Sequence, residues 1–234
     1  MNTIDVIGDS YSDEEHMFLD QTDIRKDPNK TYLELLRSNF YINNYSWHGI
    51  GASQAIDRLK NITNKTDFLL FLLPQIKRIK FKNSENENVT VDYVDYKYKK
   101  LSDDKQKTYD SIYSSTLLDL YDTLCLTYVF NFSKKYKKIL IWPVSKNKFE
   151  GLCHIPSNCH IVEKHLDQIS EEEYIKVSSK QKINEDQRNN HLSGVNHEIL
   201  SDQIRNYFLY DMTPDVDLFK QQLSNNNITE FLYE

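Results

Sequence analysis

A serine follows directly after the first apolar stretch of the sequence. The run from Ile4 to Ile7 is typical of a short buried strand, and it ends at the turn residues Gly8 and Asp9, so that Ser10 comes next. Open α/β sheets bind ligands at the carboxyl ends of their strands. A serine hydroxyl at that edge is a candidate nucleophile, whereas the ordinary role of the triplet Gly-Asp-Ser is a plain turn.

A serine nucleophile needs a general base within hydrogen-bond reach, and one histidine near the other end of the chain has a suitable setting. His191 lies in a polar segment just before a predicted helix, whose apolar positions Ile199, Leu200, Ile204 and Phe208 recur at helical spacing. Ser193 suits the N-cap of that helix. The two side chains together favour acyl-group chemistry, in which the imidazole removes the hydroxyl proton.

At these two positions the chain resembles the SGNH/GDSL family of serine esterases and lipases. In that family Gly-Asp-Ser follows the first strand, and a histidine lies in a loop just before the last helix, as Gly8-Asp9-Ser10 and His191 do here. The resemblance implies that Ser10 is the nucleophile and His191 the general base. It also implies that Asp9 holds the turn by hydrogen bonds.

The acid that orients the histidine has more than one candidate. The family writes this block Asp-x-x-His, but Arg188 occupies the position three residues before His191. Asp186 is the first candidate, because it lies only two residues further upstream. A backbone carbonyl in this role, or no acid at all, are the alternatives.

The resemblance also suggests donors for an oxyanion hole. The segment 44–53 is similar to the family's second block, with Gly51 as the better match for the backbone donor and Gly49 as the alternative. The family's third block, Gly-x-Asn-Asp, is absent. Gln75 follows the apolar run 68–73 where its first Asn would be, and a glutamine amide can also donate a hydrogen bond. Arg78 fits a variant of the family with an arginine here.

The function implied is cleavage of small acyl esters by a Ser-His(-Asp) mechanism, including O-acetyl groups on a carbohydrate. The expected partner is therefore a small acyl ester or an acylated glycan. An O-acyltransferase could use the same Ser-His pair. A third reading is a non-catalytic relative that binds a ligand or partner at the same edge, and the missing Gly-x-Asn-Asp and Arg188 favour it.

The elements that must position these residues alternate along the chain. Apolar periodicity predicts strands over 4–7, 41–47, 67–73, 137–144 and 157–162, and helices over 31–39, 53–62, 105–135 and 195–210. This order predicts an α/β protein, a three-layer α/β/α sandwich with a mostly parallel sheet of the SGNH-hydrolase or flavodoxin-like type. We expect a single domain over 1–234, with an inserted loop or hairpin at about 77–104 and a helical tail at about 212–234.

Composition excludes several other classes of protein. The 234 residues are 39% hydrophobic and 27% charged, with a net charge of −6, which argues against nucleic acid as a main partner. The longest apolar run, 68–73, is far too short for a membrane span. Three cysteines and no recognisable signal peptide predict a reducing, cytoplasmic location.

No cofactor or metal is predicted. The chain has no glycine-rich phosphate loop, so a nucleotide cofactor is not expected. Cys153 and Cys159, each followed by a histidine, lack a second ligand pair at the spacing that zinc sites use. We interpret them as part of an ordinary loop.

Overall fold

A parallel sheet forms the centre of the molecule. The computed structural model describes residues 1–9, 11–12, 31–47, 50–74, 78–82, 88–92, 110, 115–144, 154–169, 192 and 194–219. The strands of the main sheet are β1 (Asn2–Ile7), β2 (Phe40–Asn44), β3 (Phe68–Leu73), β6 (Lys138–Pro143) and β7 (Cys159–Ile161). They lie in the order β2-β1-β3-β6-β7, and each neighbouring pair is parallel. The expected mostly parallel sheet is thus confirmed.

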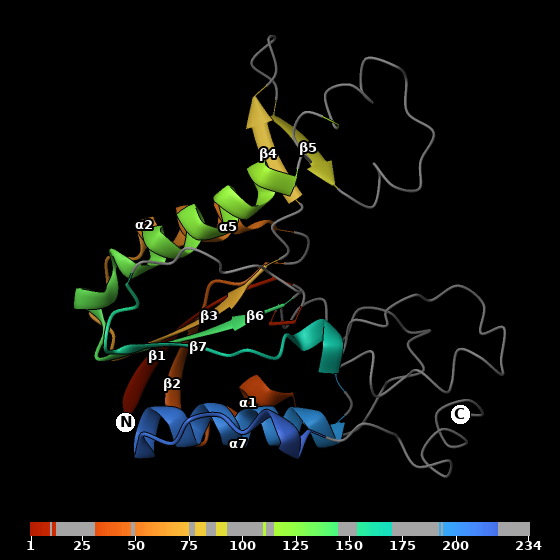
Figure 1. Ribbon diagram of the computed structural model, residues 1–234. Helices are drawn as coiled ribbons and strands as arrows, with labels where there is room; N and C mark the ends of the chain where they lie inside the picture. Colours follow the sequence, from red (N-terminus) through yellow and green to blue (C-terminus); the bar gives the residue numbers. More distant parts are fainter. Residues whose placement is uncertain are drawn as a thin grey trace, which may run out of the picture.

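Helices cover both faces of this sheet (Figure 1). On one face lie α1 (Tyr32–Leu36) and α7 (Gly194–Tyr210), and on the other lie α2 (Ala52–Asn61) and α5 (Ser115–Phe130). Parallel strands need long crossover connections, and helices placed in those connections cover the two faces. The predicted three-layer α/β/α arrangement is confirmed.

Strand alternation divides the core into two clusters. All six residues of β3 are buried. Phe68, Leu70 and Leu72 belong to the cluster under α1 and α7, while Leu69, Phe71 and Leu73 belong to the cluster under α2 and α5. A central strand covered on both faces reads as a continuous apolar run, which explains why β3 was recognisable from the sequence.

A second, two-stranded sheet lies beside α2. β4 (Arg78–Lys82) and β5 (Asn88–Asp92) pair antiparallel, and β4 contacts α2 (Figure 1). This pair falls in the segment expected to be an insertion. The predicted bounds of the insertion and of the tail stay predictions, because both segments lie partly outside the described residues.

Several helix predictions need adjustment. Of the helix predicted over 105–135, the described residues hold Asp110, which is helical, and α5, which ends at Phe130 and is followed by a short 3-10 helix (Ser133–Lys135); the predicted start lies outside the described residues. The described part of the tail holds a 3-10 helix (Val216–Leu218), whose start is capped by the Asp215 carboxylate accepting from the Asp217 N–H at 3.1 Å. Residues 166–169, for which no helix was predicted, are helical. None of the described helices combines the length and apolar character that a membrane span requires.

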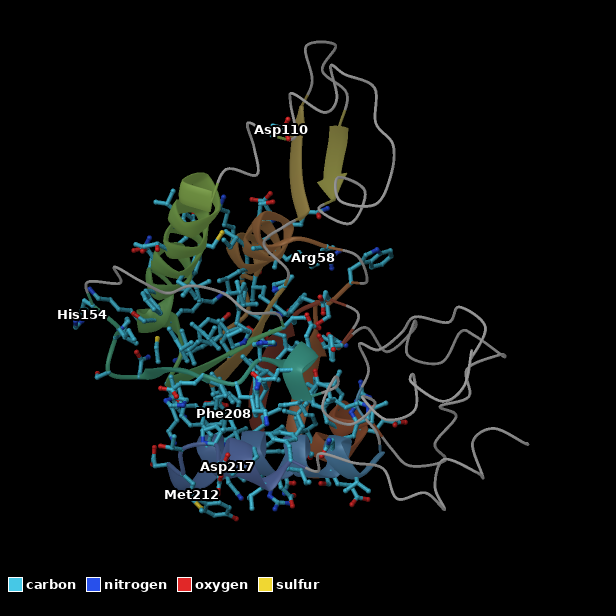
Figure 2. The ribbon with its side chains drawn as sticks, turned by 45° about the vertical axis from the view of Figure 1, so that its right-hand side comes forward. Arg58, Asp110, His154, Phe208, Met212 and Asp217 are labelled. Carbon is cyan, nitrogen blue, oxygen red and sulfur yellow. The ribbon has the colours of Figure 1, made fainter. Side chains whose placement is uncertain are left out.

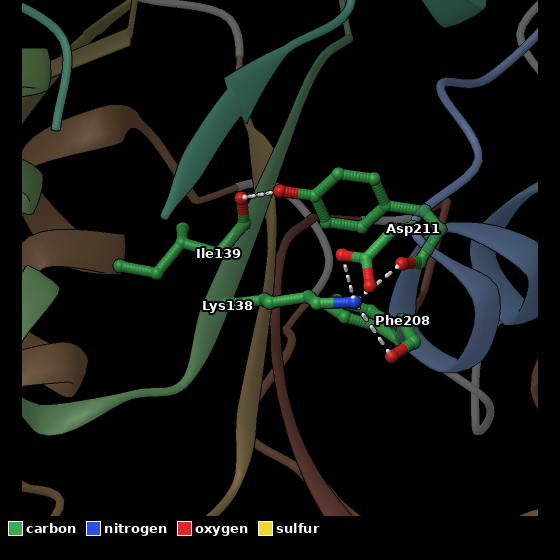
Figure 3. A network of polar contacts seen from close by, with 5 residues as sticks. Lys138, Ile139, Phe208 and Asp211 are labelled. Atoms are coloured by element: carbon green, nitrogen blue, oxygen red, sulfur yellow. Dashed lines mark hydrogen bonds and ion pairs between the residues drawn. The ribbon is translucent and has the colours of Figure 1, made fainter. Parts of the chain in front are cut away.

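Contacts at the end of α7 fix its direction relative to the sheet. Lys138, the first residue of β6, donates from Nζ to the carbonyl oxygens of Tyr207 and Phe208, each at 3.1 Å, and pairs with the Asp211 carboxylate (Figure 3). The Tyr207 hydroxyl donates to the Ile139 carbonyl at 3.0 Å. The carboxyl end of α7 therefore lies at the amino edge of the sheet. A helix of 17 residues spans roughly 25 Å, so α7 begins toward the carboxyl edge of the strands.

Candidate active site

The strand order places a ligand-binding edge at the end of β1. Counted along the chain, the main-sheet strands lie in the order 2-1-3-4-5, so the direction of winding reverses between β1 and β3. Doubly wound sheets bind ligands outside the carboxyl ends of the strands at such a switch point. The candidate nucleophile Ser10 follows β1 by three residues in the sequence, and Gln75 follows β3 by two.

The chain on either side of position 10 is held by buried hydrogen bonds. Asp9 is buried, and its Oδ1 accepts from the Tyr11 N–H at 3.2 Å. The Asp9 carbonyl accepts from the Ser12 N–H at 3.0 Å, a bond that spans position 10. Asp9 thus holds the turn, as the family resemblance implied.

Gly8 must be a glycine because the turn packs closely against β3. A Cβ at this position would lie 2.3 Å from Ser12 Oγ and 2.9 Å from the Cβ of Leu72. The Ser12 hydroxyl could rotate away, but the Cβ of Leu72 is fixed by its backbone. The absence of a side chain at Gly8 therefore allows the turn to lie directly beside the neighbouring strand.

Ser12, the other serine of this turn, is fully buried. Its carbonyl accepts from Asn44 Nδ2 at 2.7 Å, which ties the turn to the end of β2. A nucleophile must meet its substrate, so Ser12 is excluded from that role.

Tyr11 joins the turn after β1 to the segment that follows β7, near the end of β6. Its ring is buried, and its hydroxyl donates to Asp167 Oδ1 at 3.0 Å. The Asp167 N–H donates to the carbonyl of Val144, directly after β6, at 2.8 Å. Neither Tyr11 nor Asp167 was singled out from the sequence, because residues 156 positions apart give no local signal of their contact.

The segment after β2 runs alongside the end of β1. The N–H groups of Tyr45 and Trp47 donate to the carbonyls of Val6 and Gly8, at 2.8 and 3.1 Å. Arg58, on α2 (Figure 2), donates to the Tyr45 carbonyl at 2.8 Å, and its guanidinium lies 5.5 Å from the centre of the Trp47 ring. An exposed aromatic ring and a cation therefore lie close to the turn.

Gly51, the predicted oxyanion donor, is the N-cap of α2. It is buried, and its N–H donates to Gln54 Oε1 at 3.1 Å, while the Gln54 N–H donates back to the Gly51 carbonyl at 3.1 Å. The bond to Gln54 Oε1 is the glutamine half of a capping box, and because glycine has no side chain, the Gln54 N–H bonds the backbone carbonyl instead. The N–H that we expected to meet an oxyanion therefore has a partner within its own helix turn.

The other predicted site residues lie outside the described part of the chain. These are Ser10, Gln75, Asp186 and His191, and also Gly49, so their roles stay predictions. Leu192, directly after His191 in the sequence, is buried and belongs to the same core cluster as Tyr11. Tyr11, directly after Ser10 in the sequence, and Leu192 thus contribute to one apolar cluster.

His197, in the first turns of α7, has a structural role. Its Nδ1 accepts from the Tyr32 N–H at 3.4 Å, and its ring stacks on the Tyr32 ring with centroids 5.9 Å apart. Packing removes the imidazole from water and lowers the pKa of His197 to about 4. The neutral ring joins the beginning of α1 to that of α7.

The cysteine and histidine segment shows no metal-binding arrangement in the part that is described. Burial raises the pKa of the Cys159 thiol to about 12, so it stays protonated. Among the described residues, no three histidine, cysteine, aspartate or glutamate side chains lie close enough together to hold a metal ion. Cys153 lies outside the described residues.

A buried carboxylate in β1 was also missed. Asp5 is fully buried, and it accepts from the Tyr136 hydroxyl and from Asn43 Nδ2, each at 2.9 Å. Burial, and then the charge of Asp5, raise the pKa of Tyr136 above its usual range. A charged residue within an apolar strand was the available signal. Tyr136 precedes β6 and therefore lies at the amino edge of the sheet, away from the Ser10 turn.

Comparisons with known proteins give matches to solved structures. No family model matches the sequence, and no curated protein sequence is significantly similar to it. The chain is similar to Axe2, an acetyl xylan esterase from Geobacillus stearothermophilus. For one Axe2 variant the sequence identity is 12%, the alignment covers 92% of this chain and 97% of Axe2, and the TM-score is 0.47. For a second Axe2 variant the TM-score is 0.46.

A further similar structure is a lipolytic protein of the G-D-S-L family from Veillonella parvula. The two chains are 11% identical over an alignment that covers 89% of this chain and 98% of the Veillonella protein, with a TM-score of 0.42. The fold implied by the SGNH/GDSL resemblance, parallel strands between two helix layers, is the fold of the described residues. The strand order of the sheet carries this assignment.

Proposed function

We propose that the protein is a serine esterase that cleaves small acyl esters, including O-acetyl groups on carbohydrates, with Ser10 as nucleophile and His191 as general base. The observation that carries the proposal is the turn after β1. Gly8, Asp9 and Tyr11 form a tightly bonded turn beside the switch point of the sheet, which is where doubly wound folds carry their chemistry.

The direction of α7 supports the choice of base. Its carboxyl end is bound to the first residue of β6, so the helix begins toward the edge at which β1 ends. His191 precedes this helix by three residues. Two residues 181 positions apart in the sequence are thus expected at one edge of the sheet.

In the proposed mechanism, Ser10 Oγ attacks the ester carbonyl while His191 removes its proton. The imidazolium then protonates the leaving alcohol as the C–O bond breaks, which leaves an acyl-serine. Water, deprotonated by His191, attacks this acyl group and releases the carboxylic acid and free Ser10. Asp186 would hold the imidazole in the tautomer that accepts the serine proton.

The developing oxyanion would accept hydrogen bonds from the backbone N–H groups of Ser10 and Gly51 and from the Gln75 amide. Each such donor typically lowers the barrier by about 3 kcal/mol. For Gly51 to take part, its N–H must exchange Gln54 Oε1 for the oxyanion. That exchange is favourable because hydrogen bonds to a charged oxygen are about twice as strong as those between neutral groups.

A second candidate is a non-catalytic protein that binds a ligand at the same edge. The hydrogen bond from Gly51 to Gln54 favours it, since that donor is already occupied, and so does Arg188 at the family's usual acid position. This candidate keeps the fold and the edge but needs no activated serine.

Labelling with a fluorophosphonate probe separates the two candidates. We expect the wild-type protein to be labelled on Ser10, and Ser10→Ala and His191→Ala to lose the label. Ser12→Ala is the matched control, because Ser12 is buried in the same turn and should leave labelling unchanged. A folded wild-type protein that is not labelled would exclude the esterase and leave the binding protein.

The reaction type is tested with p-nitrophenyl acetate and with an acetylated sugar. Release of acetate without an acceptor indicates a hydrolase. Product that forms only when a sugar alcohol is added, with transfer of the acetyl group to that alcohol, indicates the acyltransferase that uses the same Ser-His pair.

A further inference from the structure

Both chain neighbours of Ser10 are buried and bonded, but in different ways. Asp9 is bonded within the turn, through its side chain to the Tyr11 N–H and through its carbonyl to the Ser12 N–H. Tyr11 is bonded across the sheet, through its hydroxyl to Asp167 Oδ1 at 3.0 Å. The first set gives the turn its shape, and the second fixes the turn relative to the remaining strands.

Asp167 is held firmly enough to act as an anchor. Its N–H donates to the Val144 carbonyl at 2.8 Å, directly after β6. The residue just before the short helical segment that carries it accepts two bonds: His165 Nδ1 accepts from the Gln168 N–H at 3.0 Å, and the His165 carbonyl accepts from the Ile169 N–H at 3.3 Å.

This contact adds a polar link between two parts of the carboxyl edge that also share an apolar cluster. The turn after β1 and the segment after β7 come from strands separated by β3 and β6 in the sheet. A tyrosine hydroxyl bound to a carboxylate is a charge-assisted hydrogen bond, which is short, directional and stronger than a neutral one.

We propose that Tyr11 and Asp167 are positioning residues for Ser10, holding the backbone of the turn so that the serine hydroxyl points at the substrate carbonyl. This inference rests on the proposed esterase function. A displacement of about 1 Å at a reacting group can lower the rate on the order of 100-fold. Loss of the Tyr11 hydroxyl should therefore affect the rate of attack by serine far more than the binding of substrate.

The test compares Tyr11→Phe, Asp167→Ala and Asp167→Asn. We expect the first two to lower the rate constant for fluorophosphonate labelling, and kcat for p-nitrophenyl acetate, by roughly 10-fold to 100-fold, with KM changed less than threefold. Asp167→Asn keeps an oxygen acceptor for the tyrosine hydroxyl and should restore most of the rate.

The matched control is Tyr136→Phe. It removes a hydrogen bond of the same kind, between a buried tyrosine hydroxyl and the Asp5 carboxylate at 2.9 Å, but at the opposite edge of the sheet. It should lower the melting temperature and leave the labelling rate of the folded protein unchanged. A general loss of stability would affect both tyrosine variants alike, whereas a positioning role affects only Tyr11→Phe.

A double-mutant cycle tests whether the two residues act through each other. Tyr11→Phe combined with Asp167→Ala should be no slower than the slower single variant, because each change already breaks the same bond. If the losses in labelling rate of the two single variants multiply in the double variant, the inference is wrong. It is also wrong if Tyr11→Phe is labelled within twofold of the wild-type rate. If Tyr11→Phe does not fold, the same limit applies to Asp167→Ala. A wild-type protein without labelling would overturn the esterase proposal, and this inference with it.

Discussion

Lys138 should contribute much more to stability than its neighbour Lys137. Its ammonium bonds two carbonyl oxygens at the end of α7, and its side chain is only 21% exposed. Hydrogen bonds to a charged group contribute about 1.5–3 kcal/mol net, and a cation at a helix carboxyl end adds about 0.3–1 kcal/mol. Ordering a lysine side chain opposes this by up to about 2 kcal/mol.

The expected result for Lys138→Met is therefore a loss of about 2 kcal/mol in the free energy of unfolding. Methionine keeps the apolar stem in place and removes only the ammonium. The ion pair with Asp211 contributes little, because that carboxylate is 81% exposed. Asp211→Asn, which suits the left-handed backbone at this position (φ 58°), should cost less than about 1 kcal/mol.

Urea titration followed by circular dichroism measures the three variants. Lys137→Met is the matched control, because the Lys137 side chain is 69% exposed and its ammonium pairs with Asp67 at 2.8 Å. It should cost less than about 1 kcal/mol. If Lys138→Met is no more destabilising than Lys137→Met, the bonds to the α7 carbonyls do not hold this helix on the sheet. The position of the first turn of α7 then no longer follows from them.

Three further predictions concern single residues. Gly8→Ala should destabilise the protein by about 1–3 kcal/mol, seen as a lower urea midpoint, because the new methyl group overlaps the Cβ of Leu72; an unchanged midpoint would contradict the close packing of the turn. The hydrogen bond from Lys137, and then the Thr3 N–H, lower the pKa of Asp67. Its contribution is therefore complete above about pH 4 and is lost as the pH falls through the lower folded-state pKa, so the stability difference between wild type and Asp67→Asn should shrink below about pH 4. A difference that does not depend on pH would refute this. Gln54→Ala removes the competing acceptor of the Gly51 N–H; if Gly51 serves the oxyanion, kcat for p-nitrophenyl acetate should rise about two- to tenfold, since a neutral hydrogen bond contributes about 0.5–1.5 kcal/mol. An unchanged or lower kcat would argue against Gly51 as a donor.

The sequence was sufficient for the layers of the fold because local patterns specify them. A buried central strand needs apolar residues on both faces, and Phe68–Leu73 supplies them without interruption. The Thr31 and Glu34 side chains form a capping box that begins α1 at the expected place. Such signals lie within a few residues of one another and need no knowledge of the rest of the chain.

Contacts between distant segments could not be predicted in the same way. Nothing near Tyr11 indicates that its hydroxyl meets Asp167, and nothing near Asp5 indicates that Tyr136 and Asn43 surround it. The prediction for Gly51 depended on both a local pattern and a side-chain contact. The sequence indicated a glycine at the start of a helix, but the acceptor of its N–H depends on which way the Gln54 side chain turns.

The position of β1 in the sheet has a consequence for biosynthesis. β1 pairs with both β2 and β3, so about sixty residues after β1 must be synthesised before both partner strands exist. α7 comes after all five strands of the main sheet in the sequence, and its carboxyl end is bound to Lys138 in β6. Contacts of such long sequence separation form late and slowly. A chain synthesised only as far as β7 would thus carry the candidate serine without the candidate base, and the proposed esterase activity would require the segment that follows β7.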